Sequence, residues 1–60
     1  MNNVVFKNAR LFLDKTQADF AQMLGMSTQQ VGRIETGSLP VSTRARAKLL
    51  ANFDVSNPTF

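Results

Sequence analysis

The chain has 60 residues, a length that allows one small domain with a limited hydrophobic core. Its composition excludes disulfides, zinc fingers and histidine-based metal or acid–base sites, because it contains no cysteine and no histidine. Seven lysines and arginines against four acidic residues give a net charge of +3, a mild basic excess that is compatible with nucleic acid without proving it.

The first predicted helix covers residues 4–14. Its apolar residues follow the i, i+3, i+4, i+7 spacing of a helix that buries one face, with Lys7 and Arg10 between them. Asp14 and Lys15 break this pattern and end the helix. The residues expected to face the core are Val5 or Phe6, Ala9, Phe12 and Leu13.

Two short helices with a tight turn between them are predicted next, over about residues 17–24 and 28–35. Thr or Ser precedes each helix as an N-cap, and a glycine follows each, where a left-handed conformation costs glycine little. The caps are Thr16 and Ser27, the glycines are Gly25 and Gly37, and the inward residues are Phe20, Ala21, Leu24, Val31 and Ile34. This pattern is typical of a helix-turn-helix, which usually places its second helix in the major groove of DNA.

A fourth helix is predicted from Thr43 to about Phe53. Pro40 prevents the preceding helix from continuing, and Ser42 can cap the new one. The sequence therefore predicts a single all-α domain over residues 1–60, a small four-helix bundle with a short C-terminal tail and the helix-turn-helix at about 17–36. The fourth helix is expected to bury Ala45, Leu49, Leu50 and Phe53 and to leave Arg44, Arg46 and Lys48 beside solvent.

Membranes, cofactors and catalysis are not expected. No apolar run is long enough to cross a bilayer, and the N-terminal MNNVVFKNAR lacks the apolar centre and cleavage site of a signal peptide. Without histidine or cysteine, catalysis would fall to a few carboxylates and lysines, so we expect no enzyme, no metal, no cofactor and no small-molecule substrate. The five phenylalanines are the only aromatic residues, which favours duplex DNA over single strands that bind by base stacking.

Three pieces of the sequence form a specific combination. They are TQADFAQ at 16–22, LGMS at 24–27 and V-x-R-I-E-x-G at 31–37, and R-A-x-x-x-L-L-x-x-F-D-V-S follows in the fourth helix. With these pieces the chain resembles the phage repressor and Cro-type helix-turn-helix family, often called XRE-like. The resemblance implies a lambda-repressor-like fold and a DNA-binding repressor of phage or prophage origin. Such a protein would work in the bacterial cytoplasm, associated with the nucleoid.

The resemblance also implies which residues contact DNA. Gln17 matches a phosphate-binding glutamine that steadies the start of the recognition helix, which here is the helix over 28–35. Thr28 stands where the nearest relatives often have Gln, and its hydroxyl reaches less far. The implied base contacts are Thr28, Gln29, Gly32 and Arg33, and the implied backbone contacts are Thr16, Gln17, Gln30, Thr36, Gly37, Ser38 and Arg44.

The chemistry of the recognition helix agrees with these roles. Gln29 can bond N6 and N7 of adenine, and Arg33 can bond O6 and N7 of guanine, each through two hydrogen bonds. The alternative is an ordinary polar helix face. Gly32 would let the helix axis approach the groove floor, or it is a tolerated surface glycine that costs about 1 kcal/mol relative to alanine.

Two structural roles follow from the resemblance. Arg10 and Glu35 occupy positions that resemble a buried ion pair in several phage repressors. The family usually continues into a fifth helix that forms much of the dimer contact, whereas SNPTF follows here. We therefore expect Val55 and Phe60 to meet a second subunit.

The expected function is sequence-specific binding of double-stranded DNA by a Cro-like transcriptional repressor. One recognition helix reads only a few base pairs, so a homodimer on a palindromic operator is expected, with half-sites about one helical turn apart. The same fold serves antitoxins and directionality factors of recombination. A helical protein-interaction module that does not bind DNA is a third alternative, and all three stay open at this point.

Overall fold

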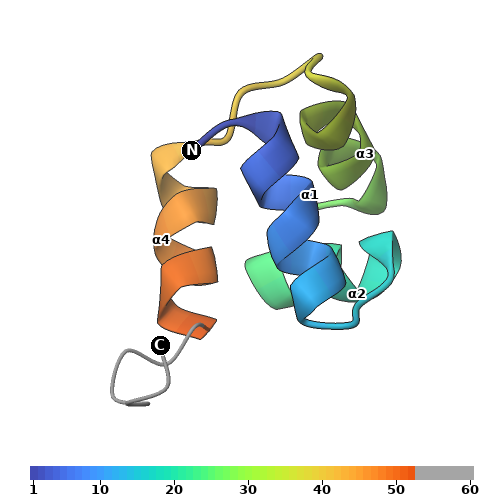
Figure 1. Ribbon diagram of the computed structural model, residues 1–60, viewed down its shortest axis with the longest axis vertical. Helices are drawn as coiled ribbons and strands as arrows, with labels where there is room; N and C mark the ends of the chain where they lie inside the picture. Colours follow the sequence, from blue (N-terminus) through green and yellow to red (C-terminus); the bar gives the residue numbers. More distant parts are fainter. Residues whose placement is uncertain (53–60) are drawn as a thin grey trace.

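The computed structural model describes residues 1–52 and contains four helices in that range. They are α1 (Asn3–Phe12), α2 (Gln17–Leu24), α3 (Thr28–Thr36) and α4 (Thr43–Asn52). In Figure 1, α1 stands in front, α3 lies to its right and α4 to its left. The predicted all-α fold with four helices is confirmed. The predicted roles of Phe53, Val55 and Phe60 lie outside the described residues.

The helices begin where local side chains satisfy their first backbone N–H groups. The Thr16 hydroxyl accepts a hydrogen bond from the Asp19 amide at 3.1 Å, and the Ser42 hydroxyl accepts one from the Ala45 amide at 3.1 Å. Asn2, for which no role was predicted from the sequence, caps α1 by accepting a hydrogen bond from the Val5 amide at 2.8 Å. These caps explain why α2 and α4 begin at the predicted residues.

The first three helices end in left-handed residues. Gly25 has φ 69° and Gly37 has φ 87°, as predicted for the residues that close α2 and α3. Asp14 takes the same role after α1 with φ 56°, and its amide donates to the Leu11 carbonyl at 3.0 Å. The chain thus reverses direction tightly between α1 and α2 although no glycine is present there.

The core is built around a pair of phenylalanine rings. Phe6 of α1 and Phe20 of α2 are both fully buried, and their ring centroids lie 5.0 Å apart at an interplanar angle of 65°. This edge-to-face arrangement is favourable for aromatic rings and fixes α1 against α2. The other buried hydrophobic residues of the described range are Ala21, Leu24, Val31, Ile34, Ala45 and Leu49.

Of the alternatives Val5 and Phe6, Phe6 is the buried one, whereas Phe12 and Leu50 were expected inside and are exposed. Val5 keeps 47% of its surface, Phe12 69% and Leu50 47%. α1 has apolar residues on more than one side, and the side with Phe6 faces the core. Leu50 follows the buried Leu49 by one residue, which turns it about 100° away from the core, given 3.6 residues per helical turn.

Two helix ends also differ from the sequence prediction. α1 ends at Phe12 rather than at Asp14, because the left-handed Asp14 already belongs to the turn. α3 runs one residue further than expected, to Thr36, before Gly37 closes it. No helix within residues 1–52 is long and apolar enough to cross a membrane.

Candidate nucleic-acid interface

α3 has one buried side and one open side. Val31 and Ile34 are buried in the core, whereas Thr28, Gln29 and Arg33 are exposed. The spacing of 3.6 residues per turn therefore gathers the proposed base-contacting side chains on the surface of the helix, away from the bundle. An amide and a guanidinium in these positions are free to meet base edges in a groove.

The start of α3 is closed by a capping box. The Ser27 hydroxyl accepts a hydrogen bond from the Gln30 amide at 3.1 Å, and the Gln30 side-chain oxygen accepts one from the Ser27 amide at 3.0 Å. The Gln30 side chain, a proposed backbone contact, thus already holds the helix start through its oxygen. Its amide nitrogen is the atom that could still donate to a phosphate.

The end of α3 is closed by several bonds to one carbonyl. The Arg33 carbonyl accepts from the Ser38 amide at 2.8 Å, the Leu39 amide at 3.1 Å and the Thr36 hydroxyl at 3.1 Å. The hydroxyls of Thr36 and Ser38 lie 3.2 Å apart. The proposed backbone contacts Thr36, Gly37 and Ser38 therefore form one ordered, exposed turn after the helix.

Behind α3, Glu35 is the centre of a polar network. The Arg10 guanidinium donates to both carboxylate oxygens of Glu35, through Nε at 2.7 Å and through Nη2 at 3.1 Å. Their side chains are only 13% and 5% exposed, so the structure brings this pair together in a largely buried position. A third donor of Arg10, Nη1, reaches the Lys15 carbonyl at 2.9 Å and ties the α1–α2 turn to the same network.

These contacts change the acidity of Glu35. Burial by itself would raise its pKa, since burial disfavours the charged carboxylate. The hydrogen bonds from Arg10 and Gln17 and the positive charges of Arg10 and Lys7 act in the opposite direction and outweigh burial, so that the pKa is lowered. Glu35 is therefore ionised at neutral pH and binds α3 to α1 as a carboxylate.

The Gln17 side chain contacts the last turn of α3 rather than its start. Its side-chain amide donates to Glu35 Oε1 at 3.2 Å, in the last turn of α3, whereas the resemblance implied a role at the start of that helix. The reason is physical: the buried carboxylate offers a stronger acceptor than the short hydroxyl of Thr28. Gln17 thus helps to orient α3, and its half-buried amide keeps a second N–H for another acceptor.

Gly32 faces Gln17 as well as the open side of α3. It is half-buried, and a methyl group on its α-carbon would lie 4.0 Å from Gln17 Nε2, an ordinary van der Waals distance. Packing against α2 therefore does not require glycine at this position. Because glycine has no side chain, the helix surface carries no protruding group at Gly32, between the exposed Gln29 and Arg33.

Asn3 has a role that was not predicted from the sequence. Its side-chain amide donates to the Glu35 carbonyl at 3.3 Å and lies 3.6 Å from where a Cβ of Gly37 would be. This bond holds the end of α3 from the start of α1. Asn3 and Glu35 are 32 positions apart, and no local pattern in the sequence relates them.

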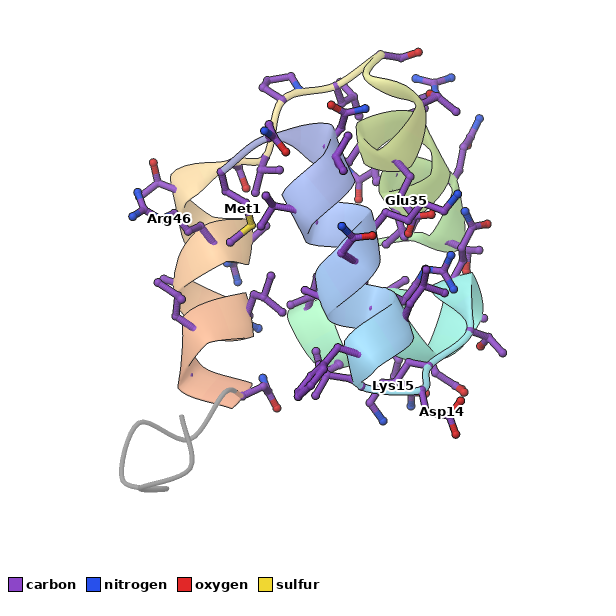
Figure 2. The ribbon with its side chains drawn as sticks, viewed as in Figure 1. Met1, Asp14, Lys15, Glu35 and Arg46 are labelled. Atoms are coloured by element: carbon purple, nitrogen blue, oxygen red, sulfur yellow. The ribbon has the colours of Figure 1, made fainter. Side chains whose placement is uncertain are left out.

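Arg44 borders a shallow groove beside the start of α3. The groove has a volume of about 190 Å³ and is lined by residues 24–26 and by Gln30, Ser42, Arg44 and Ala45. Arg44 is exposed and shares this groove with Gln30, another proposed backbone contact. Arg46, by contrast, points to the side of α4 away from α3 (Figure 2).

Other kinds of site find no support in residues 1–52. No group of three or more His, Cys, Asp or Glu side chains that could hold a metal occurs there. Every buried side-chain nitrogen or oxygen in this range has a hydrogen-bond partner, so that no buried polar group is left open toward a ligand.

One of three comparisons with known proteins identifies a helix-turn-helix family. A family model described as helix-turn-helix, HTH_3, matches residues 6–56 of the chain. Comparison with curated proteins and with solved structures gave no significant match in either case. The matched range contains all four helices except the first turn of α1, and it includes the whole candidate interface.

Proposed function

The chain belongs to the HTH_3 family of helix-turn-helix domains, a non-enzymatic family that binds DNA, and from this premise we propose that it is a sequence-specific transcriptional repressor. It binds a palindromic operator by placing α3 in the major groove of duplex DNA, and it acts by occupying the operator. Origin in a phage or prophage is part of the same proposal.

The observation that carries this proposal is the division of α3 into two sides. Its apolar residues Val31 and Ile34 are buried, while Gln29 and Arg33 are exposed on a helix that is capped at both ends. A rigid helix with exposed amide and guanidinium groups suits hydrogen bonding to base edges, which discriminates by about 1–3 kcal/mol for each two-bond pair.

The backbone contacts are proposed on the same geometry. The proposed contacts to the DNA backbone come from α3, from the turn after it, and from the starts of α2 and α4. They are Thr16, Gln17, Gln30, Thr36, Gly37, Ser38 and Arg44. The Thr28 hydroxyl is proposed as a base contact. Because one short helix reads only a few base pairs, two copies of the chain bind together on two half-sites about one helical turn apart.

The decisive experiment removes the two base-reading side chains. Binding sites are first selected from a random pool of duplexes, and the affinity of the chain and of the double variant Gln29→Ala/Arg33→Ala is then measured by fluorescence anisotropy. We expect the preference for the selected site over random duplex to fall about fivefold to 150-fold for each side chain, since each pair is worth about 1–3 kcal/mol.

A matched variant controls for loss of fold and of charge. Gln22 and Arg46 are exposed on α2 and α4, so Gln22→Ala/Arg46→Ala removes the same two residue types outside the interface. It should leave the preference unchanged, and circular dichroism should show both variants folded. If Gln29→Ala/Arg33→Ala keeps the full preference, α3 does not read the operator, and a protein-interaction module becomes the better explanation.

A further inference from the structure

Two glutamines follow each other near the start of α3, and the structure gives them different roles. The Gln30 side-chain oxygen accepts a hydrogen bond from the Ser27 amide at 3.0 Å, which turns this side chain back toward the helix start. The Gln29 side chain is exposed and has no hydrogen-bond partner within residues 1–52. Adenine is recognised by an amide that uses its oxygen and its nitrogen together. Gln29 therefore has the complete pair of groups for adenine, whereas the oxygen of Gln30 is already engaged.

Arg33 keeps its whole guanidinium for a base. It is exposed, and its side chain makes no hydrogen bond or ion pair in the part of the chain that the structure describes. Glu35, the acidic residue nearest to it in the sequence, is held by Arg10 at 2.7 Å and by Gln17 at 3.2 Å. A guanidinium that is free of carboxylates can offer two parallel donors to O6 and N7 of guanine.

The spacing of these two side chains sets the distance between the bases that they read. Gln29 and Arg33 are four residues apart, so they lie on the same side of the helix and about 6 Å apart along its axis. Base pairs in a duplex follow each other at about 3.4 Å, so that two steps cover about 6.8 Å. A recognition helix that lies in the major groove with both side chains inward therefore reaches base pairs two steps apart.

The three residues between Gln29 and Arg33 offer no side chain to the base pair in the middle. Gln30 is engaged in the capping box, Val31 is fully buried in the core and Gly32 has no side chain. Direct reading of a base requires a hydrogen-bonding or apolar group at its edge. The middle base pair is thus not read by α3.

We propose that each half-site of the operator contains an A·T pair and a G·C pair two base steps apart, with an unread base pair between them. Gln29 binds the adenine and Arg33 binds the guanine, each through two hydrogen bonds. This half-site rests on the proposed function, in which α3 enters the major groove, and adds the identity and the spacing of the bases to it.

Selection from a random pool of duplexes, repeated with single variants of the full chain, tests this half-site. The unchanged chain should enrich the two base pairs at this spacing. In anisotropy titrations it should prefer each of them over its substitutes by about fivefold to 150-fold, the range for one two-bond pair. Gln29→Ala should lose the preference at the A·T step alone, and Arg33→Ala at the G·C step alone. Exchange of the middle base pair should have a smaller effect than exchange of either neighbour.

Gln30 supplies the matched control, because it is the same residue type one position away. Gln30→Ala should weaken binding by the same factor on every duplex and leave the enriched bases unchanged, since its nitrogen is proposed to meet a phosphate. Gln30→Glu keeps an acceptor for the Ser27 amide, so it gives the same comparison with the helix start intact. Circular dichroism checks that each variant is folded.

The outcomes separate this half-site from the function on which it rests. The half-site is wrong if the selected duplexes depend on Gln29 and Arg33 but contain other bases or another spacing. It is also wrong if Gln30→Ala rather than Gln29→Ala relaxes the A·T step, and in both cases α3 still reads the operator. If Gln29→Ala/Arg33→Ala binds the selected duplexes unchanged, or if no duplex is enriched, the proposed function fails and the half-site fails with it.

Discussion

Glu35 joins α3 to both α1 and α2. Its carboxylate accepts hydrogen bonds from Arg10 of α1 and Gln17 of α2, and its own backbone carbonyl accepts one from Asn3. Arg10 in turn bonds to the Lys15 carbonyl in the α1–α2 turn. One residue on the inner side of α3 thus fixes the recognition helix to both helices that precede it.

The Arg10–Glu35 ion pair is expected to contribute to the stability of the fold. Arg10→Met should lower the free energy of unfolding by about 3–5 kcal/mol, because it leaves the buried Glu35 carboxylate without its charged partner. Urea unfolding followed by circular dichroism measures this loss. Arg46→Met, at an exposed arginine of α4, should change stability by less than about 0.5 kcal/mol. Equal stability of the Arg10 variant and the unchanged chain would show that the pair contributes little.

The lowered pKa of Glu35 predicts how stability depends on pH. In the unfolded chain this carboxylate takes up a proton near its ordinary pKa of about 4.3, whereas in the folded chain it does so only at lower pH. Its contribution is therefore complete above about pH 5 and is lost as the pH falls through the lowered value.

A comparison with Glu35→Gln isolates this contribution from those of the other carboxylates. The difference in unfolding free energy between the chain and the variant should be largest at pH 6–7 and should shrink steadily toward about pH 3. Urea titrations at several pH values give this difference directly. A difference that stays constant from pH 7 to pH 3 would contradict a lowered pKa.

At the scale of the helices, the sequence predicted most where the determinants are local. The Thr16 hydroxyl and the Asp19 amide are three residues apart, and so are the partners in the capping box of α3. Such contacts depend on nearby residues, so α2 began and ended at the predicted positions and α3 began at Thr28.

The sequence predicted less where a contact forms between residues that are far apart in the chain. Both Phe6 and Phe12 fit an apolar helix face, and Phe6 is the one that packs against Phe20 and the rest of the core. Gln17 meets Glu35, 18 positions away, rather than the start of α3. The DNA contacts themselves follow from the family resemblance and the exposed face of α3, and they stay predictions.

Gly32 offers a prediction for α3 as a whole. Gly32→Ala should raise the free energy of unfolding by about 1 kcal/mol, since alanine favours a helix and its methyl group would lie 4.0 Å from Gln17 Nε2. If α3 enters the groove closely at this point, the same variant should bind DNA more weakly. Thermal unfolding and anisotropy on one sample give both values.

The same substitution at Gly25 is the contrasting control. Gly25 has φ 69°, and a methyl group there would lie 2.9 Å from Lys48 Nζ, so Gly25→Ala should destabilise the chain by about 1–2 kcal/mol. Destabilisation of similar size at Gly32 would mean that α3 has a backbone or packing requirement there. A more stable Gly32→Ala with unchanged DNA affinity would instead identify Gly32 as a tolerated surface glycine.

At the scale of the whole molecule, the position of each basic residue matters more than the net charge of +3. Arg10 is bound to Glu35 and is not available to phosphates. Arg33 and Arg44 lie exposed on α3 and beside the groove that borders its start, whereas Arg46 points away from α3 (Figure 2). The basic residues that are open toward DNA are therefore fewer than the composition indicates.

This distribution predicts how salt affects DNA binding. The logarithm of the affinity should fall linearly with the logarithm of salt concentration, with a slope of about −0.9 for each phosphate that is neutralised. Arg44→Ala should make the slope shallower by about 1 and weaken binding equally on the selected site and on random duplex, because a phosphate contact does not depend on base sequence.

Arg46→Ala should leave the slope unchanged, since that side chain faces away from α3 (Figure 2). Anisotropy titrations between about 50 and 300 mM salt, a roughly sixfold range in which such slopes are measurable, separate the two variants. Equal slopes for the chain and for Arg44→Ala would remove Arg44 from the interface and leave the contacts to the turn after α3 and to the start of α2.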